Sequence, residues 1–182
     1  RPLSHAVAQT VAERRAVREL VNAYGSDSLA FFALRRDKSY HFSPTRRAFL
    51  AYRVVAGAAL ISGDPVGDAA EFDPLLDDFK RFAYANGWRL AVVGALYENL
   101  PHYERLGMRA IPIGDEAVLV PAEFSLDGRA IRKVRQSVSR LQKAGYRFRV
   151  AEADDLNEVE RAELDDVSSA WRGRQVERGF SM

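Results

Sequence analysis

The stretch 119-LVPAEFSLDGRAIRKVRQSVSRLQKAGYRFRV-150 organises the interpretation of the whole chain. In order, it predicts a strand, a cap, a helix, a turn and a second strand. Apolar side chains recur at helical spacing at Ile131, Val134, Val138 and Leu141. We expect Ser125 or Asp127 to cap the start of this helix. We expect Gly145 to end it, because a helix C-terminus favours a residue that tolerates positive φ.

The predicted helix is strongly basic. Residues 128–149 contain eight basic side chains and no acidic one. Five of these cations fall roughly opposite the apolar face: Arg129, Arg132, Lys133, Arg140 and Lys143. Arg135 falls at the border of the apolar face, so we expect its guanidinium to lie along a groove. A helix of this kind is suited to face an anion.

Two other interpretations of the basic helix stay open. A basic helix face is often simply a solvated surface. The segment 152–166, with eight acids and one arginine, could also neutralise the helix within the molecule. The functional interpretation is favoured because the helix lacks the acids at i,i+4 that a purely solubilising surface would carry.

Composition limits the classes of function. A length of 182 residues is within the range of one domain or one and a half, and 47% apolar side chains are enough to build a core. The net charge is only +2, so any contact with nucleic acid or anionic lipid must come from local clusters of charge. The absence of cysteine excludes disulfides and thiolate zinc sites, and three scattered histidines predict no metal site.

No signal peptide or membrane span is predicted. The longest apolar run, residues 49–61, carries Arg53 and falls short of the roughly 20 residues that a span needs. This run predicts a pair of strands joined as a hairpin through Ala56 and Gly57. We expect the chain to be a piece of a longer protein.

The order of the predicted elements indicates a fold class. The elements are a helix at 6–24, strands at 28–34, 40–43, 49–55 and 58–62, a helix at 73–86, a strand at 88–93, a short helix at 96–106, a strand at 108–113 and, beyond the basic helix, a strand at 146–150 and a helix at 156–171. This is the order of the GNAT acyltransferases. We therefore predict an α/β (α+β) fold with a mixed, mostly antiparallel central sheet flanked by helices.

The loop SGDPVG, residues 62–67, is predicted at the carboxyl end of a buried strand, where ligands gather in α/β folds. Its backbone N–H groups, with Gly63 among them, could cradle a phosphate, or the loop could be a simple tight turn. No Lys and Ser/Thr follow at P-loop spacing, which argues against a nucleotide triphosphatase. The loop stands where acetyl-CoA users carry Q/R-x-x-G-x-G/A, which favours a GNAT fold that does not use acetyl-CoA.

Several motifs in order carry a resemblance to a known family. They are SGDPVG (62–67), YERLGM (103–108), IGDEAVL (113–119), FSLDG (124–128), KAGY (143–146) and W-x(5)-ERGFSM (171–182). Together they resemble the soluble C-terminal domain of the lysyl-phosphatidylglycerol synthases, the multiple peptide resistance factor or DUF2156 family. The segment SLAFFALRRDKSYHF (28–42) is most similar to the actinobacterial form fused to a lysyl-tRNA synthetase. One departure is Ser139-Arg140, where the family commonly has Asn-Arg.

The resemblance implies two tandem GNAT folds. The chain would then hold the first fold at 1–120, a connecting basic helix at 121–145 and the truncated start of the second fold at 146–182. It also implies transfer of an aminoacyl group from aminoacyl-tRNA, lysyl-tRNA in particular, to the glycerol hydroxyl of phosphatidylglycerol. The product would be a cationic lipid that gives resistance to cationic peptides.

The resemblance further implies a place and partners. The reaction would occur at the cytoplasmic face of the membrane, on a full-length integral membrane protein of which this chain is a soluble piece. The partners would be aminoacyl-tRNA and an anionic membrane surface, and a homo-oligomer could cover apolar surface left by the incomplete second fold. Transfer of an activated ester to an alcohol needs no metal or redox cofactor.

The reaction needs a proton acceptor for the lipid hydroxyl and cations for phosphates. Arg132 and Arg135 are our candidates for phosphate contact, because arginine clamps phosphate in a bidentate way. The substrate-binding set also includes Gly63 and Trp171, and the wider tRNA or lipid phosphate field comprises Arg129, Lys133, Arg140 and Lys143. Asp64 and Glu177 are the candidate catalytic carboxylates. Structural roles for Asp64 and Glu177, and a core position for Trp171, are the alternatives.

Two rival functions stay open. One is an N-acyltransferase that uses acetyl-CoA, which has the GNAT order alone in its favour. The other is a non-catalytic domain that docks on RNA or on an anionic membrane. We also expect residues 1–182 alone to have little transfer activity.

Overall fold

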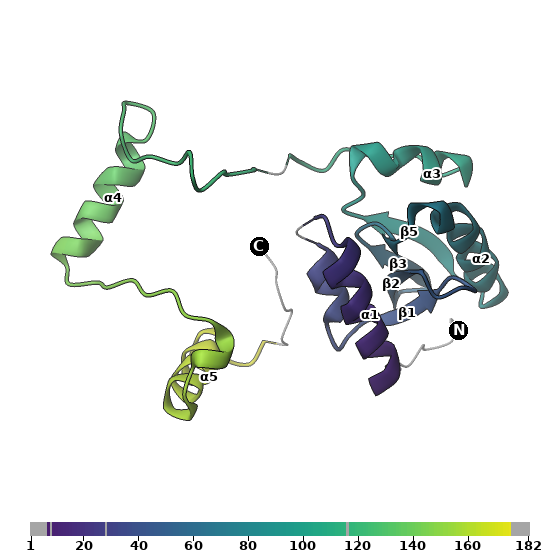
Figure 1. The fold of residues 1–182 in the computed structure, drawn as a ribbon, viewed down its shortest axis with the longest axis horizontal. Helices are drawn as coiled ribbons and strands as arrows, with labels where there is room; N and C mark the ends of the chain where they lie inside the picture. Colours follow the sequence, from purple (N-terminus) through teal and green to yellow (C-terminus); the bar gives the residue numbers. More distant parts are fainter. Residues whose placement is uncertain (1–6, 8, 28, 116, 176–182) are drawn as a thin grey trace. The chain divides into compact units, whose positions relative to one another are not determined.

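The structure is a computed structural model and describes residues 7, 9–27, 29–115 and 117–175. The chain forms two compact units, Arg1–Gly114 and Asp115–Met182 (Figure 1). The division falls near the end of the predicted first fold, and the three-part division at 120 and 145 stays a prediction.

The first unit is a mixed sheet with helices on both faces. Its helical elements are α1 (Val11–Tyr24), η1 (Ala30–Leu34), η2 (Ala69–Glu71), α2 (Phe72–Ala85), η3 (Tyr97–Asn99) and α3 (Leu100–Arg105). Its strands are β1 (Ser39–Phe42), β2 (Ala48–Val55), β3 (Ala58–Ser62), β4 (Val66–Gly67) and β5 (Arg89–Val93). The α+β class with a mixed sheet flanked by helices is thereby confirmed.

The sheet has the order β1-β2-β3-β5, with β4 paired to β2. β1, β2 and β3 form an antiparallel meander, whereas β3 and β5 are parallel, with Ser62 opposite Val93. The predicted hairpin through Ala56 and Gly57 is confirmed: both residues have positive φ, at 49° and 75°. This is the sign of φ that a two-residue hairpin of type I′ needs.

The two faces of β2 belong to two different cores. Leu50 and Tyr52 point into the core under α2, whereas Phe49 and Ala51 point into the core under α1 and η1. Alternation of side chains along a strand produces this division. It explains why residues 48–52 are all buried and read as one continuous apolar run.

The predicted strand at 28–34 is wrong. Residues 30–34 form the 3₁₀ helix η1, because the Asp27 carboxylate accepts hydrogen bonds from the backbone N–H groups of Leu29 and Ala30, at 2.6 and 2.8 Å. A short apolar run fits a buried strand or a buried helical turn equally well. The first helix begins at Val11 with a capping box between Thr10 and Glu13, and its predicted start at Ala6 lies outside the described residues.

The predicted strands at 108–113 and 146–150 are also wrong, as is the strand expected at the start of the stretch 119–150, since the described residues in these segments pair with no other strand. Ile111, Ile113 and Phe148 are 73, 81 and 91% exposed. The alternation of apolar residues indicates a strand only where a partner supplies backbone hydrogen bonds. The short helix predicted at 96–106 is present as η3 and α3.

The second unit contains α4 (Arg132–Lys143), η4 (Ala153–Asp155) and α5 (Glu158–Arg172). The basic helix is therefore confirmed, but neither predicted residue caps it: the Ser125 hydroxyl donates to the Asp127 carboxylate, and the helix starts after Ile131 without a side-chain cap. Its end is as predicted. Gly145 has φ +87°, and the N–H groups of Gly145 and Tyr146 donate to the carbonyls of Gln142 and Leu141.

Replacement of Gly67 by alanine should destabilise the first unit strongly. Gly67 has φ +136°, and an added Cβ would lie 2.2 Å from the Arg47 carbonyl oxygen and 2.5 Å from the Ala48 Cα. We expect Gly67→Ala to lower the free energy of unfolding by about 3 kcal/mol, because backbone must move. Urea denaturation followed by the fluorescence of the buried Trp88 measures this loss.

Gly87→Ala is the matched control. Gly87 also has positive φ, at +71°, but no atom lies within 4 Å of an added Cβ. Only the conformational cost of about 1 kcal/mol should appear. Equal losses in the two variants would contradict the close approach of β4 to β2.

Candidate functional site

The loop 62–67 follows β3 beside the end of β5, as its sequence predicts. The two strand ends stay joined beyond the last strand residue, because the Gly63 N–H donates to the Val93 carbonyl at 2.9 Å. The N–H of Gly63, predicted to contact substrate, is therefore engaged within the sheet.

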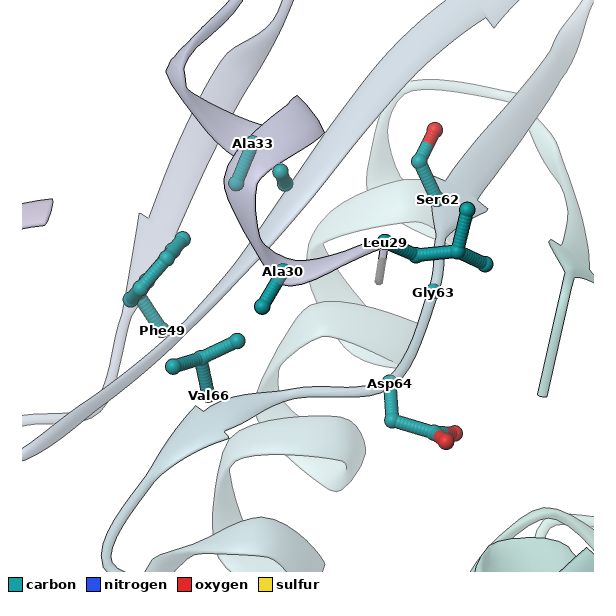
Figure 2. A pocket seen from close by; sticks show the side chains of 9 residues that line it. Leu29, Ala30, Ala33, Phe49, Ser62, Gly63, Asp64 and Val66 are labelled. Atoms are coloured by element: carbon teal, nitrogen blue, oxygen red, sulfur yellow. The ribbon is translucent and has the colours of Figure 1, made fainter. Parts of the chain in front are cut away.

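Leu29 fills the space next to these strand ends. An added Cβ at Gly94 would lie 2.4 Å from Leu29 Cδ1, and one at Gly63 would lie 3.4 Å from Leu29 Cβ. The recess lined by Leu29, Ser62, Gly63 and Asp64 (Figure 2) has no room for a water-sized molecule. The crevice that α/β folds commonly use for ligands is thus closed by a side chain in this unit.

Asp64 is a buried carboxylate, 8% exposed, and its two oxygens accept three hydrogen bonds. The donors are the Leu96 backbone N–H at 2.9 Å, Asn99 Nδ2 at 2.9 Å and the Tyr103 hydroxyl at 2.6 Å. These donors lie in the segment after β5, in η3 and in α3. Asp64 therefore ties the loop after β3 to the whole connection that follows β5.

The protonated state of Tyr103 favours its hydrogen bond to Asp64. Burial, together with the neighbouring charge of Asp64, raises the pKa of the Tyr103 phenol far above its usual range. The phenol stays protonated and donates to Asp64. Since three donors already satisfy the carboxylate, its role in the structure is to hold η3 and α3, and a catalytic role for Asp64 stays a prediction.

The cations of α4 and of the turn before it are exposed. Among the described residues, Arg129, Arg132, Lys133 and Lys143 form no ion pair, and Arg140 contacts only the Ser137 hydroxyl at 3.5 Å. Arg135 differs, because its guanidinium donates to the carbonyls of Leu126 and Gly128 and so fixes the turn before the helix.

A shallow, open depression runs along α4. Its lining consists of Arg135, Gln136, Ser139, Arg140 and Lys143. Three of the predicted phosphate-binding residues therefore share one surface, and Arg129, Arg132 and Lys133 do not line it. The surface has both cations and amide or hydroxyl donors, which suits a phosphate-bearing ligand.

The structure gives less support to the remaining predicted site residues. Trp171 on α5 is 88% exposed, so the alternative of a core position does not apply in the described unit. Glu177 lies outside the described residues. Within the described ranges, no three His, Cys, Asp or Glu side chains gather as a metal site would need. No helix found there is long and apolar enough to cross a membrane.

Sequence reasoning missed one polar contact. The Lys38 ammonium donates to the Ser62 hydroxyl at 2.6 Å across 24 residues of sequence, although the sequence analysis gives Lys38 no role. In the sequence, Lys38 is recognisable only as a lysine directly before a predicted strand. Its partner Ser62 can be identified only once the pairing of the strands is known.

Comparison with known proteins agrees with the resemblance that the motifs carry. The family described as phosphatidylglycerol lysyltransferase, C-terminal, matches residues 18–182. The chain belongs to this family. Over 176 residues it is 42% identical to the lysylphosphatidylglycerol biosynthesis bifunctional protein LysX of Mycobacterium marinum, and over 171 residues it is 40% identical to LysX of Rhodococcus jostii. These alignments span 96 and 93% of the chain but only 16 and 15% of the relatives.

Solved structures support the fold. L-PGS from Bacillus licheniformis superposes with a TM-score of 0.80 at 24% identity, over 92% of this chain and 51% of that one. The C-terminal DUF2156 domain assigned to a lysylphosphatidylglycerol synthetase of Agrobacterium fabrum gives 0.74 at 30% identity, over 86 and 50%. The chain thus spans about half of each solved structure.

Asp64→Asn should destabilise the first unit by about 3 kcal/mol. The asparagine side chain would place an NH2 group, which only donates, in a position where three donors need an acceptor. At least one buried polar group would then lack a partner, which is costly. Tyr103→Phe removes one donor and leaves Asp64 with two, so we expect a loss of about 1–2 kcal/mol. Urea denaturation monitored at Trp88 compares the two. If Asp64→Asn lowered the free energy of unfolding no more than a substitution at an exposed position does, the structural role of the Asp64 hydrogen bonds would be contradicted.

Proposed function

We propose that this chain is part of an aminoacyltransferase that moves lysine from lysyl-tRNA to the glycerol hydroxyl of phosphatidylglycerol. One observation carries the proposal: the family match extends over residues 18–182, and relatives named for lysylphosphatidylglycerol biosynthesis align along 96% of the chain. The name of these relatives favours lysine over other amino acids as the group transferred.

The surface chemistry supports both substrates. Transfer RNA and phosphatidylglycerol share the phosphodiester, and α4 offers arginine and lysine side chains without acidic partners in the described structure. Arg132 is our first candidate for a direct phosphate contact because nothing described engages its guanidinium. Arg135 instead holds the turn 126–128, and we propose that it positions the start of α4.

We further propose that the first unit is a GNAT-like fold and the first of a tandem pair. The helix, meander, strand, helix and strand order supports this, as does the coverage of only half of each solved relative. Apolar side chains of the second unit, such as Val159, Val167 and Phe148, are at least 68% exposed, which favours their burial by further chain or by a second copy.

The reaction sets demands on these residues. The lipid hydroxyl must lose its proton as it attacks the aminoacyl ester, and the tRNA ribose oxygen leaves. Asp64 and Glu177 remain the candidate proton acceptors, with Glu177 favoured because Asp64 already accepts three hydrogen bonds. We place the reaction at the cytoplasmic face of the membrane, where tRNA and lipid headgroups meet.

The acetyl-CoA alternative finds no support in the first unit. Leu29 fills the space at the ends of β3 and β5, and the Gly63 N–H that a pyrophosphate would need donates to Val93.

Loss of two α4 cations should weaken tRNA binding and its salt dependence. We expect Arg132→Gln with Lys133→Gln, in the full-length protein, to reduce the slope of log K against log salt by about 2, because each phosphate contact releases counterions. Filter binding of lysyl-tRNA at several salt concentrations measures the slope.

Arg15→Gln with Arg18→Gln is the matched control. These two arginines lie on α1, are exposed and form no ion pair among the described residues, and the change in net charge is identical. A wild-type slope in the α4 double variant, or an equal drop in the α1 variant, would argue against α4 as the tRNA surface.

The chain by itself should transfer little lysine. We expect residues 1–182 to give less than about a thousandth of the rate of the full-length protein, because groups that act as a unit lose most of their effect when some are missing. Radiolabelled lysine transfer to phosphatidylglycerol vesicles measures both rates. Equal turnover by the short chain would show that the reacting groups lie within it.

A further inference from the structure

A second polar cluster lies on the sheet face opposite α2. Ser62 is the last residue of β3, and alternation places its side chain opposite to those of Ala59 and Ile61, which are fully buried in the α2 core. Lys38, directly before β1, reaches this hydroxyl and donates to it at 2.6 Å. Figure 2 shows that the Ser62 and Asp64 side chains leave the loop in different directions, so the cluster is separate from the Asp64 tie.

The charges around Lys38 are not balanced. Arg35 and Arg53 both donate to the same carboxylate, Asp37, at 2.9 and 3.0 Å. Among the described residues, the charged neighbours of the Lys38 ammonium are Arg35, Arg53 and Asp37, and with Lys38 itself their local charge is 3 − 1 = +2.

Burial lowers the pKa of the Lys38 ammonium, and the neighbouring Arg35 and Arg53 lower it further, against the opposing effect of Asp37. The charged form of Lys38 is therefore incompletely compensated by its surroundings. A bound anion would supply the missing compensation.

The hydrogen-bonding groups of the cluster also favour an anion. A lysine ammonium has three donors and no acceptor, and a serine hydroxyl that accepts one of them keeps its own proton to donate. Within the described part of the chain, Ser62 is the only group that hydrogen-bonds to the Lys38 ammonium, and the Ser62 hydroxyl has no acceptor. The pair thus presents unused donors, which fits an anionic oxygen and not a cation.

The surface next to the pair is apolar. Leu60 faces Ala91 and Ser62 faces Val93 in the parallel register, so these side chains share the face with Lys38. Leu60 and Ala91 are half-buried and Val93 is 52% exposed. A compact cationic cluster beside an apolar strip suits an amphiphile with an anionic head. A nucleic-acid backbone would instead call for a row of cations with no apolar strip.

We propose that Lys38 and Ser62, flanked by Arg35 and Arg53, bind the phosphodiester headgroup of an anionic phospholipid. In the proposed function, on which this choice of lipid rests, the headgroup is that of phosphatidylglycerol, the acceptor. Lys38 contacts a non-bridging phosphate oxygen, Ser62 orients the ammonium and adds a second donor, and the strip of Leu60, Ala91 and Val93 lies against the start of the acyl chains.

The test uses full-length protein and the soluble headgroup glycerophosphoglycerol, measured by isothermal titration calorimetry. We expect Lys38→Met to weaken binding by about tenfold or more, and Ser62→Ala by about threefold, since hydrogen bonds to charged groups are worth more than those between neutral ones. Arg36→Gln is the matched control. Arg36 lies in the same segment with the same charge, is exposed and forms no hydrogen bond or ion pair among the described residues. Binding in this control should stay within about twofold of the wild type.

A second set of measurements separates the sources of phosphate. Vesicles of phosphatidylglycerol and of phosphatidylcholine report the lipid, inorganic phosphate reports a bare anion, and lysyl-tRNA reports nucleic acid. The proposal predicts that Lys38→Met loses phosphatidylglycerol vesicles and keeps wild-type affinity for lysyl-tRNA. A loss of tRNA binding alone, a preference for inorganic phosphate over the headgroup, or equal losses in Lys38→Met and Arg36→Gln would overturn it.

The variants distinguish a folding defect from loss of the headgroup site, and loss of that site from failure of the proposed function. Ser62→Ala changes one hydroxyl and tests the site even where Lys38→Met unfolds in a thermal melt. If wild-type protein transfers no lysine but Lys38→Met loses the headgroup, the site stands and the proposed function fails. If lysine is transferred and neither Lys38→Met nor Ser62→Ala changes headgroup binding or the KM for phosphatidylglycerol, the site fails and the proposed function stands.

Discussion

The buried carboxylate of Asp64 is the interaction on which the arrangement of the first unit depends. A buried charge is tolerated only when hydrogen bonds replace the water that it lost, and three donors from the segment 96–103 do so. The same contacts fix where η3 and α3 lie against the end of β3. With Leu29 filling the adjacent space and Gly63 bonded to Val93, the recess at the strand ends is closed.

Because the recess at the strand ends is closed, the remaining candidate sites are charged surfaces, and the charges of the described residues are unevenly paired. Most arginines with close partners in the first unit join elements together: Arg47 bridges to Asp68 and Glu71, and Arg105 bridges to Asp73 and Asp77. Lys38 and the cations of α4, like the exposed Arg15, Arg18 and Arg36, have no carboxylate partner in the described structure. The surfaces around Lys38 and along α4 are the two cationic surfaces to which we assign phosphate-bearing ligands in the proposals above.

The sequence predicted the features that local chemistry controls. The hairpin at Ala56-Gly57, the end of α4 at Gly145 and the family motifs all depend on a few neighbouring residues. The 3₁₀ helix η1 was missed because an apolar run has no period of its own and the decisive contact is the Asp27 cap. The strands at 108–113 and 146–150 were wrongly predicted because a strand needs a partner that the pattern of one segment does not supply.

At the candidate site, too, contacts between residues far apart in the sequence could not be predicted. Asp64 was singled out from its loop, but its partners lie 32, 35 and 39 residues further along the chain, and no local pattern connects them. Lys38 and Ser62 meet only because β1, β2 and β3 pair in a given register. Sequence patterns therefore identified which residue types matter, and tertiary pairing determined what each of them contacts.

Amide hydrogen exchange of Leu96 and Gly63 in the wild-type protein tests the closed strand end most directly. We expect both amides to exchange as slowly as those of the β3–β5 ladder, since one donates to a buried carboxylate and the other to the Val93 carbonyl. Exchange of Leu96 and Gly63 at the rate of an exposed loop would contradict this, and would show that the hydrogen bonds to Asp64 and to Val93 open to solvent.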